Sequence, residues 1–276
     1  MDWKKGMGPL DFSSVKDILL EDPFGDIRPQ SEPYFRATPI ADGVWQVLSD
    51  GDHSYVLEGD DELLVIDAGM GAGNLRQFCQ SLCPSKPLYR MLLTHCHGDH
   101  TLNCYQFDCV YMHKDSYEGR ACTMVPGVTA PVDYPVVFIE GGDIIDLKGR
   151  PLEVIHCDEH LKGGLQFLDR KSRILFCGDE LNGNYFDSTV SVEHSYRNLL
   201  VWNSLRPYYD ILAAGNDLHD ASYVERYVKI AEYILSGQQN EGVAVYKPHT
   251  TDRVATVREC NGKRVFARRA PKFVGI

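Results

Sequence analysis

The chain has 276 residues, of which 28 are Lys or Arg and 39 are Asp or Glu, so its formal net charge is −11. An apolar fraction of 43% and a charged fraction of 24% indicate a globular protein and exclude a disordered or collagen-like chain. The acidic balance disfavours a nucleic-acid or anionic-membrane binder, because both require a basic surface. No apolar segment approaches the ~20 residues that span a bilayer, and no apolar export segment follows the first residues, so we expect a cytoplasmic protein.

The first 39 residues form a predicted N-terminal arm, because prolines interrupt them and only residues 15–20 could form a helical turn. We expect this arm to be a strap over the domain surface or a homodimer contact, with a lid over a site as the alternative. Residues 40–276 form a single predicted domain. Its predicted strands are 44–48, 54–58, 63–66, 89–93, 109–112, 136–139, 152–156, 165–168, 174–177, 211–214, 243–246, 254–259 and 265–267. Its predicted helices are 74–82, 114–120, 196–205 and 222–235. This order of elements indicates a layered α/β domain with sheet inside and helices outside.

A cluster of metal-ligand side chains follows the predicted strand 89–93, in the sequence HCHGDH at residues 95–100. His95 and His97 are two residues apart, so on extended backbone they share a face. The glycine after them allows a sharp turn that brings Asp99 and His100 toward the same point. Imidazole and carboxylate groups suit zinc or iron. The segment therefore predicts a metal site.

The segment resembles the His-x-His-x-Asp-His signature of the metallo-β-lactamase-fold superfamily. The resemblance extends over about residues 40–235. In the family's order, it includes a strand that ends in Asp67-Ala-Gly, a loop with His160, a strand that ends at Asp179 and a strand before Gly215. It implies a four-layered αβ/βα sandwich of two mixed β-sheets with outer helices. It also implies a metal-dependent hydrolase with a dinuclear site.

The resemblance assigns roles to individual residues. It implies six ligands: His95, His97 and His160 for one ion, Asp99 and His100 for a second ion, and Asp179 as the bridge. The implied cofactors are two divalent ions, with zinc favoured and iron or manganese possible, which could activate a water and polarise an acyl or phosphoryl oxygen. Asp99 could also orient that water or accept its proton, which is the catalytic role we expect for it. Asp67 stands where the family has an outer carboxylate that braces the histidine loop.

The last ligand of the family, a histidine after a glycine, is replaced here by Asn216. An amide oxygen is a weak ligand for zinc, which prefers nitrogen and sulfur donors. We expect His219 to complete the second site, ahead of a weakly held second ion. His249 from the C-terminal tail is the third alternative. Asn216 could instead bind substrate or an ordered water.

The substrate is inferred by exclusion, because the superfamily cleaves β-lactams, lactones, thioesters and phosphodiesters and the fold does not choose among them. The negative net charge disfavours a nuclease, and the absence of an export segment disfavours a secreted antibiotic-resistance enzyme. We therefore expect hydrolysis of a small ester, thioester or lactone. A phosphodiesterase and a non-catalytic metal-binding module are the alternatives, and the missing histidine favours the latter.

Side chains near the motif loops suggest a pocket for a small organic ligand. Asn184 and Tyr185 follow the segment that ends at Asp179, and amide and aromatic groups suit such a substrate. The nine cysteines predict free thiols, not a disulfide framework. Three of them lie within the motif loops, where they could be reactive beside a metal or, as we prefer, small buried apolar side chains: Cys96, Cys157 and Cys177.

Overall fold

The computed structural model describes residues 19–21, 27–29, 35–49, 53–69, 73–121, 131–181, 190–215, 217–236, 244–246, 254–260 and 263–269. The chain packs as two compact units. One comprises residues 1–139 and 144–151, and the other comprises residues 140–143 and 152–276. Among the described residues, no helix combines the length and the apolar character that crossing a bilayer requires.

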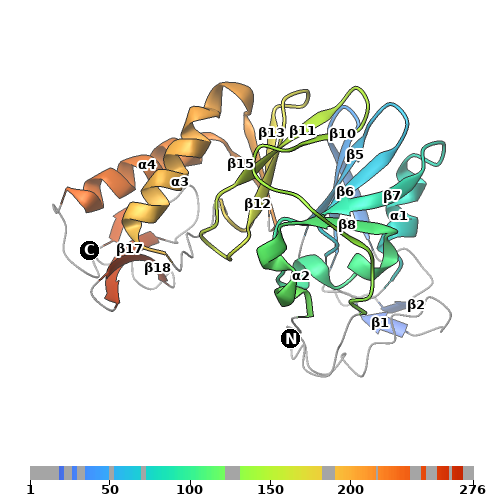
Figure 1. Ribbon diagram of the computed structural model, residues 1–276, viewed down its shortest axis with the longest axis horizontal. Helices are drawn as coiled ribbons and strands as arrows, with labels where there is room; N and C mark the ends of the chain where they lie inside the picture. The colour runs from blue at the N-terminus through green and yellow to red at the C-terminus, as the bar shows by residue number, and fades with distance from the viewer. Residues whose placement is uncertain are drawn as a thin grey trace. The chain divides into compact units, whose positions relative to one another are not determined.

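The first unit contains a seven-stranded sheet in which the strands follow their order in the sequence (Figure 1). Its strands are β3 (Arg36–Ala41), β4 (Val44–Leu48), β5 (His53–Glu58), β6 (Leu63–Ile66), β7 (Leu88–Leu92), β8 (Cys109–Met112) and β9 (Val136–Phe138). Strands β3 to β6 form an antiparallel meander, and β6 to β9 run parallel. Ile66 pairs with Leu92, and Leu92 pairs with Tyr111. The carboxyl ends of the three strands β6, β7 and β8 therefore meet at one edge of the sheet.

Helix α1 (Leu75–Leu82) makes the crossover between the parallel strands β6 and β7. Its apolar residues recur at helical spacing, and it buries Leu75 and Cys79. The Asn74 side chain caps it by accepting the Gln77 backbone N–H at 2.9 Å. The remaining elements of this unit are short: β1 (Leu19–Glu21), β2 (Ile27–Pro29), α2 (Gly98–Thr101), β10 (Ile144–Asp146) and 3₁₀ turns at Cys104–Gln106, Lys114–Ser116 and Glu118–Ala121.

In the second unit the sheet strands are β11 (Pro151–His156), β12 (Leu165–Asp169), β13 (Ile174–Gly178), β14 (Ile211–Ala214) and β15 (Leu218–Asp220), adjacent in this order. Only β13 and β14 pair in parallel, whereas their neighbours pair antiparallel. Helices α3 (Val192–Ser204) and α4 (Ser222–Leu235) lie side by side (Figure 1) and share a core with one face of this sheet. A 3₁₀ turn (Arg206–Tyr208) precedes β14, and β16 (Ala244–Tyr246), β17 (Val254–Cys260) and β18 (Lys263–Arg269) form a separate antiparallel sheet.

Most predicted elements are present, and the differences have local causes. Helix α3 begins at Val192, before the predicted residue 196, because the Ser191 side chain caps it by accepting the His194 N–H. Residues 19 and 20 form part of a strand, where a helical turn was predicted. Five strands were not predicted: β3, which includes Pro39, and the three-residue strands β1, β2, β10 and β15. Strand β3 runs across the expected end of the N-terminal arm at residue 39.

Candidate metal centre

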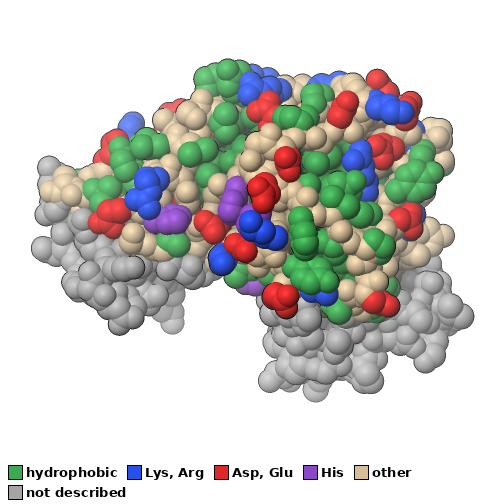
Figure 2. Space-filling view, viewed as in Figure 1, with side chains coloured by type: hydrophobic (Ala, Val, Ile, Leu, Met, Phe, Trp, Pro, Cys, Tyr) green, Lys and Arg blue, Asp and Glu red, His purple; other side chains and the backbone are tan. Residues whose placement is uncertain are grey.

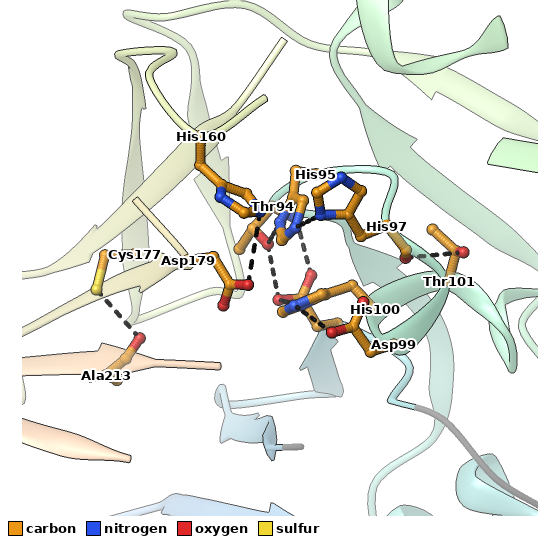
Figure 3. Close-up of polar contacts among 11 residues, drawn as sticks. Thr94, His95, His97, Asp99, His100, Thr101, His160, Cys177, Asp179 and Ala213 are labelled. Atoms are coloured by element: carbon orange, nitrogen blue, oxygen red, sulfur yellow. Dashed lines mark hydrogen bonds and ion pairs between the residues drawn. The ribbon is translucent and has the colours of Figure 1, made fainter. Parts of the chain in front are cut away.

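The histidine segment occupies the edge of the first sheet where β7 ends. Two residues separate Leu92 from His95, and the one-turn helix α2 begins at Gly98. His95 and His100 are buried, at 2% and 1% exposed, and His97 is partly exposed. The ligand nitrogens of His95 lie within 4.8 Å of those of both His97 and His100. The local fold therefore brings three imidazoles to one point, as Figure 3 shows.

Asp67 anchors this segment from the end of the neighbouring strand β6. Its Oδ1 accepts the backbone N–H of Thr94 at 2.8 Å, and its Oδ2 accepts the Thr94 hydroxyl at 2.8 Å. Oδ2 also lies 2.8 Å from Nδ1 of His100. Asp67 has a φ of 59°, in the left-handed region that aspartate tolerates better than most residues. A buried carboxylate with three donors holds both the backbone and the imidazole in place.

These contacts assign the tautomers of two imidazoles. A carboxylate oxygen accepts, so His100 Nδ1 carries the hydrogen and Nε2 is the lone-pair nitrogen. The Thr94 hydroxyl donates to Asp67, so it accepts from His95 Nδ1, 3.1 Å away. His95 Nε2 is then also a lone-pair nitrogen, and it lies 3.1 Å from His97 Nδ1. A metal-ligating imidazole usually binds the metal through one ring nitrogen and donates the hydrogen of the other to an oxygen. His95 and His100 are arranged in this way.

The surroundings of the Asp99 carboxylate indicate whether these residues suit a cation. Its Oδ1 is buried and accepts no hydrogen bond from the part of the chain that the structure describes. Its Oδ2 lies 4.0 Å from His100 Nε2. A buried oxygen without a donor costs about 1–3 kcal/mol, and a divalent cation beside it would remove that cost. Imidazole nitrogens with a carboxylate oxygen are also the donor set that zinc accepts, so these residues fit a metal ion.

Two more expected ligands lie together in the second unit. Asp179 directly follows β13, and His160 lies in the loop between β11 and β12. Asp179 Oδ2 is 3.6 Å from His160 Nε2 (Figure 3), and each side chain is 13% exposed. The loop is held at its start by Gln166, whose Nε2 donates to the Cys157 carbonyl at 3.0 Å. The fold of this unit therefore brings together a nitrogen and an oxygen donor that are 19 residues apart.

Sequence reasoning did not identify the two buried acids beside these ligands, Glu159 and Glu180. Glu180 Oε2 accepts the backbone N–H groups of Glu159 and His160, each at 2.9 Å. Burial raises the pKa of Glu159 to about 8, and burial followed by the charge of Glu159 raises the pKa of Glu180 well above its ordinary value. A signal was present for Glu180, because it stands two residues after the buried strand β13, and a buried acid needs a hydrogen-bond partner.

The structure does not bring His219 to Asp179. His219 lies on β15 and pairs with Leu212, which pairs with Leu175 on β13. Leu175, the residue of β13 at the level of His219, is four residues before Asp179. This separation corresponds to about 13 Å along the strand at ~3.3 Å per residue. The His219 ring instead lies beside Tyr223 of α4, with centroids 5.4 Å apart. The register of β15 therefore gives no support to His219 as the seventh ligand.

The other expected site residues fall outside the described part of the chain. These are the residue at the family's ligand position, the tail histidine and the expected substrate contacts: Asn216, His249, Asn184 and Tyr185. Their roles stay predictions. The same holds for most of the N-terminal arm and for the homodimer contact expected of it.

The cysteines of the motif loops are buried, so we expect them to resist alkylation in the folded protein. Burial raises the pKa of Cys157 to about 12 and also raises the pKa of Cys177, which leaves almost no thiolate at pH 8. Among the cysteines that the structure describes, we expect iodoacetamide at pH 8 to label the partly exposed Cys83 and Cys109 before the buried ones, as peptide mass spectrometry would show. Rapid native-state labelling of Cys157 would contradict this expectation, and denatured protein is the positive control.

Comparison with known proteins agrees with this geometry. A family model described as the metallo-beta-lactamase superfamily matches residues 50–208. The human protein named acyl-coenzyme A thioesterase MBLAC2 is 28% identical over 158 residues, which cover 45% of this chain and 56% of that protein. The atrochrysone carboxyl ACP thioesterase dmxR1 of Cryptosporiopsis is 26% identical over 146 residues, or 52% of this chain and 42% of that protein. The chain thus spans about half the length of these curated relatives.

Solved structures establish the fold. A metallo-beta-lactamase from Cronobacter sakazakii, a mutant of its HARLDQ motif, aligns with a TM-score of 0.57 and 17% sequence identity, and covers 74% of this chain and 96% of that chain. A metallo-beta-lactamase family protein from Thermus thermophilus aligns with a TM-score of 0.54 and 16% identity, over 72% of this chain and 81% of that chain. The expected fold class, α/β with two mixed β-sheets and helices, is confirmed.

Proposed function

Because the chain belongs to the metallo-beta-lactamase superfamily, we propose that it is a metal-dependent hydrolase of a small thioester, ester or lactone. The observation that carries this proposal is the buried histidine cluster after β7, whose imidazoles Asp67 orients directly and through Thr94. A thioester is the favoured substrate, because the human and Cryptosporiopsis relatives are both named thioesterases.

The proposed site holds two divalent ions, and zinc is the favoured metal, with iron or manganese as alternatives. The proposed ligands are His95, His97 and His160 for one ion, Asp99 and His100 for the other, and Asp179 as the bridge. The resemblance of the motifs and their order support this set, as do the contacts within each unit. The seventh ligand stays open among Asn216, His219 and His249, and a weakly held second ion follows if none of them binds.

When bound, the two ions supply Lewis-acid polarisation of an acyl oxygen and acidify water. The side chains of the protein itself orient the reacting groups and accept or donate protons. Asp99 is the residue proposed to orient the attacking water or accept its proton, and its buried oxygen, which lacks a hydrogen bond among the described residues, supports this role. Asp67 keeps His100 and, through Thr94, His95 in the tautomers that present Nε2.

A small molecule is the proposed partner. On the face that Figure 2 shows, Lys and Arg side chains are scattered among acidic and apolar ones over the described surface. Together with the net charge of −11, this distribution favours a small substrate over a polyanion such as nucleic acid. The proposed compartment is the cytoplasm, and a homodimer through the N-terminal arm is part of the same proposal.

Metal analysis and a substrate panel test the function. We expect protein purified without chelator to contain about one to two zinc, iron or manganese ions per chain. We expect the metal-loaded protein to hydrolyse acyl thioesters faster than lactones, and both faster than bis-p-nitrophenyl phosphate. Preference for the phosphodiester would indicate the alternative phosphodiesterase function, because a two-metal site serves phosphoryl transfer equally well.

Two other outcomes would contradict the proposal. A metal content below about a tenth of an equivalent after reloading would exclude a metal centre, because a site with these ligands should bind at least one ion per chain. Full metal loading without metal-dependent turnover of any panel member would indicate a binding module.

A further inference from the structure

The carboxyl group of Glu180 connects the two ligands of the second unit. We propose that Glu180 is a positioning residue that sets the place of His160 relative to Asp179. This inference rests on the proposed function, in which both residues are metal ligands. It assigns Glu180 no contact with metal or substrate.

Two consecutive residues, Asp179 and Glu180, both contact His160. Asp179 Oδ2 faces the His160 imidazole, 3.6 Å from Nε2. The next residue, Glu180, accepts the His160 backbone N–H at 2.9 Å through Oε2. The dipeptide that follows β13 therefore contacts His160 at both its side chain and its main chain. A shift of the His160 loop relative to β13 would therefore disturb both contacts.

The loop that carries His160 needs such an anchor, because residues 157–164 belong to no helix or strand. Oε2 also accepts the Glu159 N–H at 2.9 Å, so one oxygen holds two successive amides. The Glu159 side chain lies near Ser195 and Asn198 of α3. Glu180 is buried, at 6% exposed, so water competes little for its hydrogen bonds.

Gly164 provides a second, independent observation. A Cβ at residue 164 would lie 2.3 Å from Glu180 Oε1 and 3.2 Å from the Leu161 carbonyl oxygen. The φ of Gly164 is not positive, so its backbone conformation is open to alanine. The missing side chain at this position makes room for the carboxyl group of Glu180.

Metal affinity of the full-length variants tests the inference, measured by chelator competition with Zn²⁺ and by the absorption spectrum of bound Co²⁺. E180D keeps the carboxyl group but withdraws its oxygens by one methylene, and we expect it to weaken metal binding by about 10–100-fold, the range for lost outer partners of a ligand. E180Q keeps an oxygen at the same reach, so we expect affinity and spectrum close to wild type. G164A displaces the carboxyl group, so we expect it to resemble E180D.

Asp169 provides the matched control. It is a buried carboxylate of the same unit that accepts the Lys171 N–H and the Ser172 hydroxyl in the turn after β12. We expect Asp169→Asn to lower stability without changing metal affinity or the Co²⁺ spectrum. Wild-type affinity in E180D, or an E180Q variant as weak as E180D, would overturn the inference.

A metal-free measurement separates this inference from the proposed function. We expect hydrogen exchange at the amides of Glu159 and His160 to be faster in E180D than in wild type or E180Q, with metal removed. If wild type binds no metal, the proposed function fails, and the exchange rates still show whether Glu180 holds this loop. Equal rates in all three proteins would contradict the positioning role.

Discussion

Replacing His97 by alanine is expected to abolish metal-dependent turnover and to weaken metal binding by more than about 100-fold, beyond the 10–100-fold cost of losing an outer partner. His97 Nδ1 lies 3.1 Å from His95 Nε2. His95 Nε2 is a lone-pair nitrogen, because Nδ1 of the same ring donates its hydrogen to the Thr94 hydroxyl. Removal of His97 takes away one of the imidazole donors gathered at this edge of the sheet. Chelator competition and thioester hydrolysis at fixed metal concentration are the measurements.

The fold should survive this substitution. The His97 side chain makes no capping bond to α2. The contacts that start the helix use the His97 carbonyl, which accepts the His100 N–H and the Thr101 hydroxyl at 3.0 Å each, and alanine retains that carbonyl. His156→Ala is the matched control, since His156 is partly exposed and outside the proposed ligand set. Unchanged metal affinity in His97→Ala would remove His97 from the site.

Asp67→Asn is expected to weaken metal binding by about 10–100-fold and to lower stability by about 1–3 kcal/mol. Asp67 accepts from three donors, the N–H and hydroxyl of Thr94 and Nδ1 of His100. An asparagine offers only one oxygen, so whichever way it lies, its amide N–H groups face at least one of these donors. If the nitrogen takes the place of Oδ2, His100 gains by moving its hydrogen to Nε2, where it blocks ligation.

Thermal unfolding and chelator competition on the same samples would separate the two effects of Asp67→Asn. Asp169→Asn loses a similar pair of contacts, a backbone N–H and a hydroxyl, and neither contact involves an imidazole. We therefore expect both variants to be less stable, and only Asp67→Asn to bind metal more weakly. Equal metal affinities in the two variants would show that Asp67 serves stability alone.

The local sequence determined much of this protein. Periodicity placed α4 at Ser222–Leu235, because an amphipathic helix shows its buried face within a few turns. The segment after β7 predicted a metal site, since its ligand residues are neighbours in the chain and a strand delivers them. The resemblance of the motifs also placed Asp67 near this segment, and in the structure the parallel strands β6 and β7 end at one edge of the sheet.

Only the tertiary structure decided the contacts between residues that are distant in the chain. Nothing in the sequence shows that Glu180 holds the His160 amide across 20 residues, because that bond depends on how the loop after β11 meets the end of β13. His219 illustrates the same limit. It was expected to complete the second metal site, and it lies on β15, which pairs with β14, with its ring beside Tyr223. Strand pairing is non-local, and register decides which face each side chain occupies.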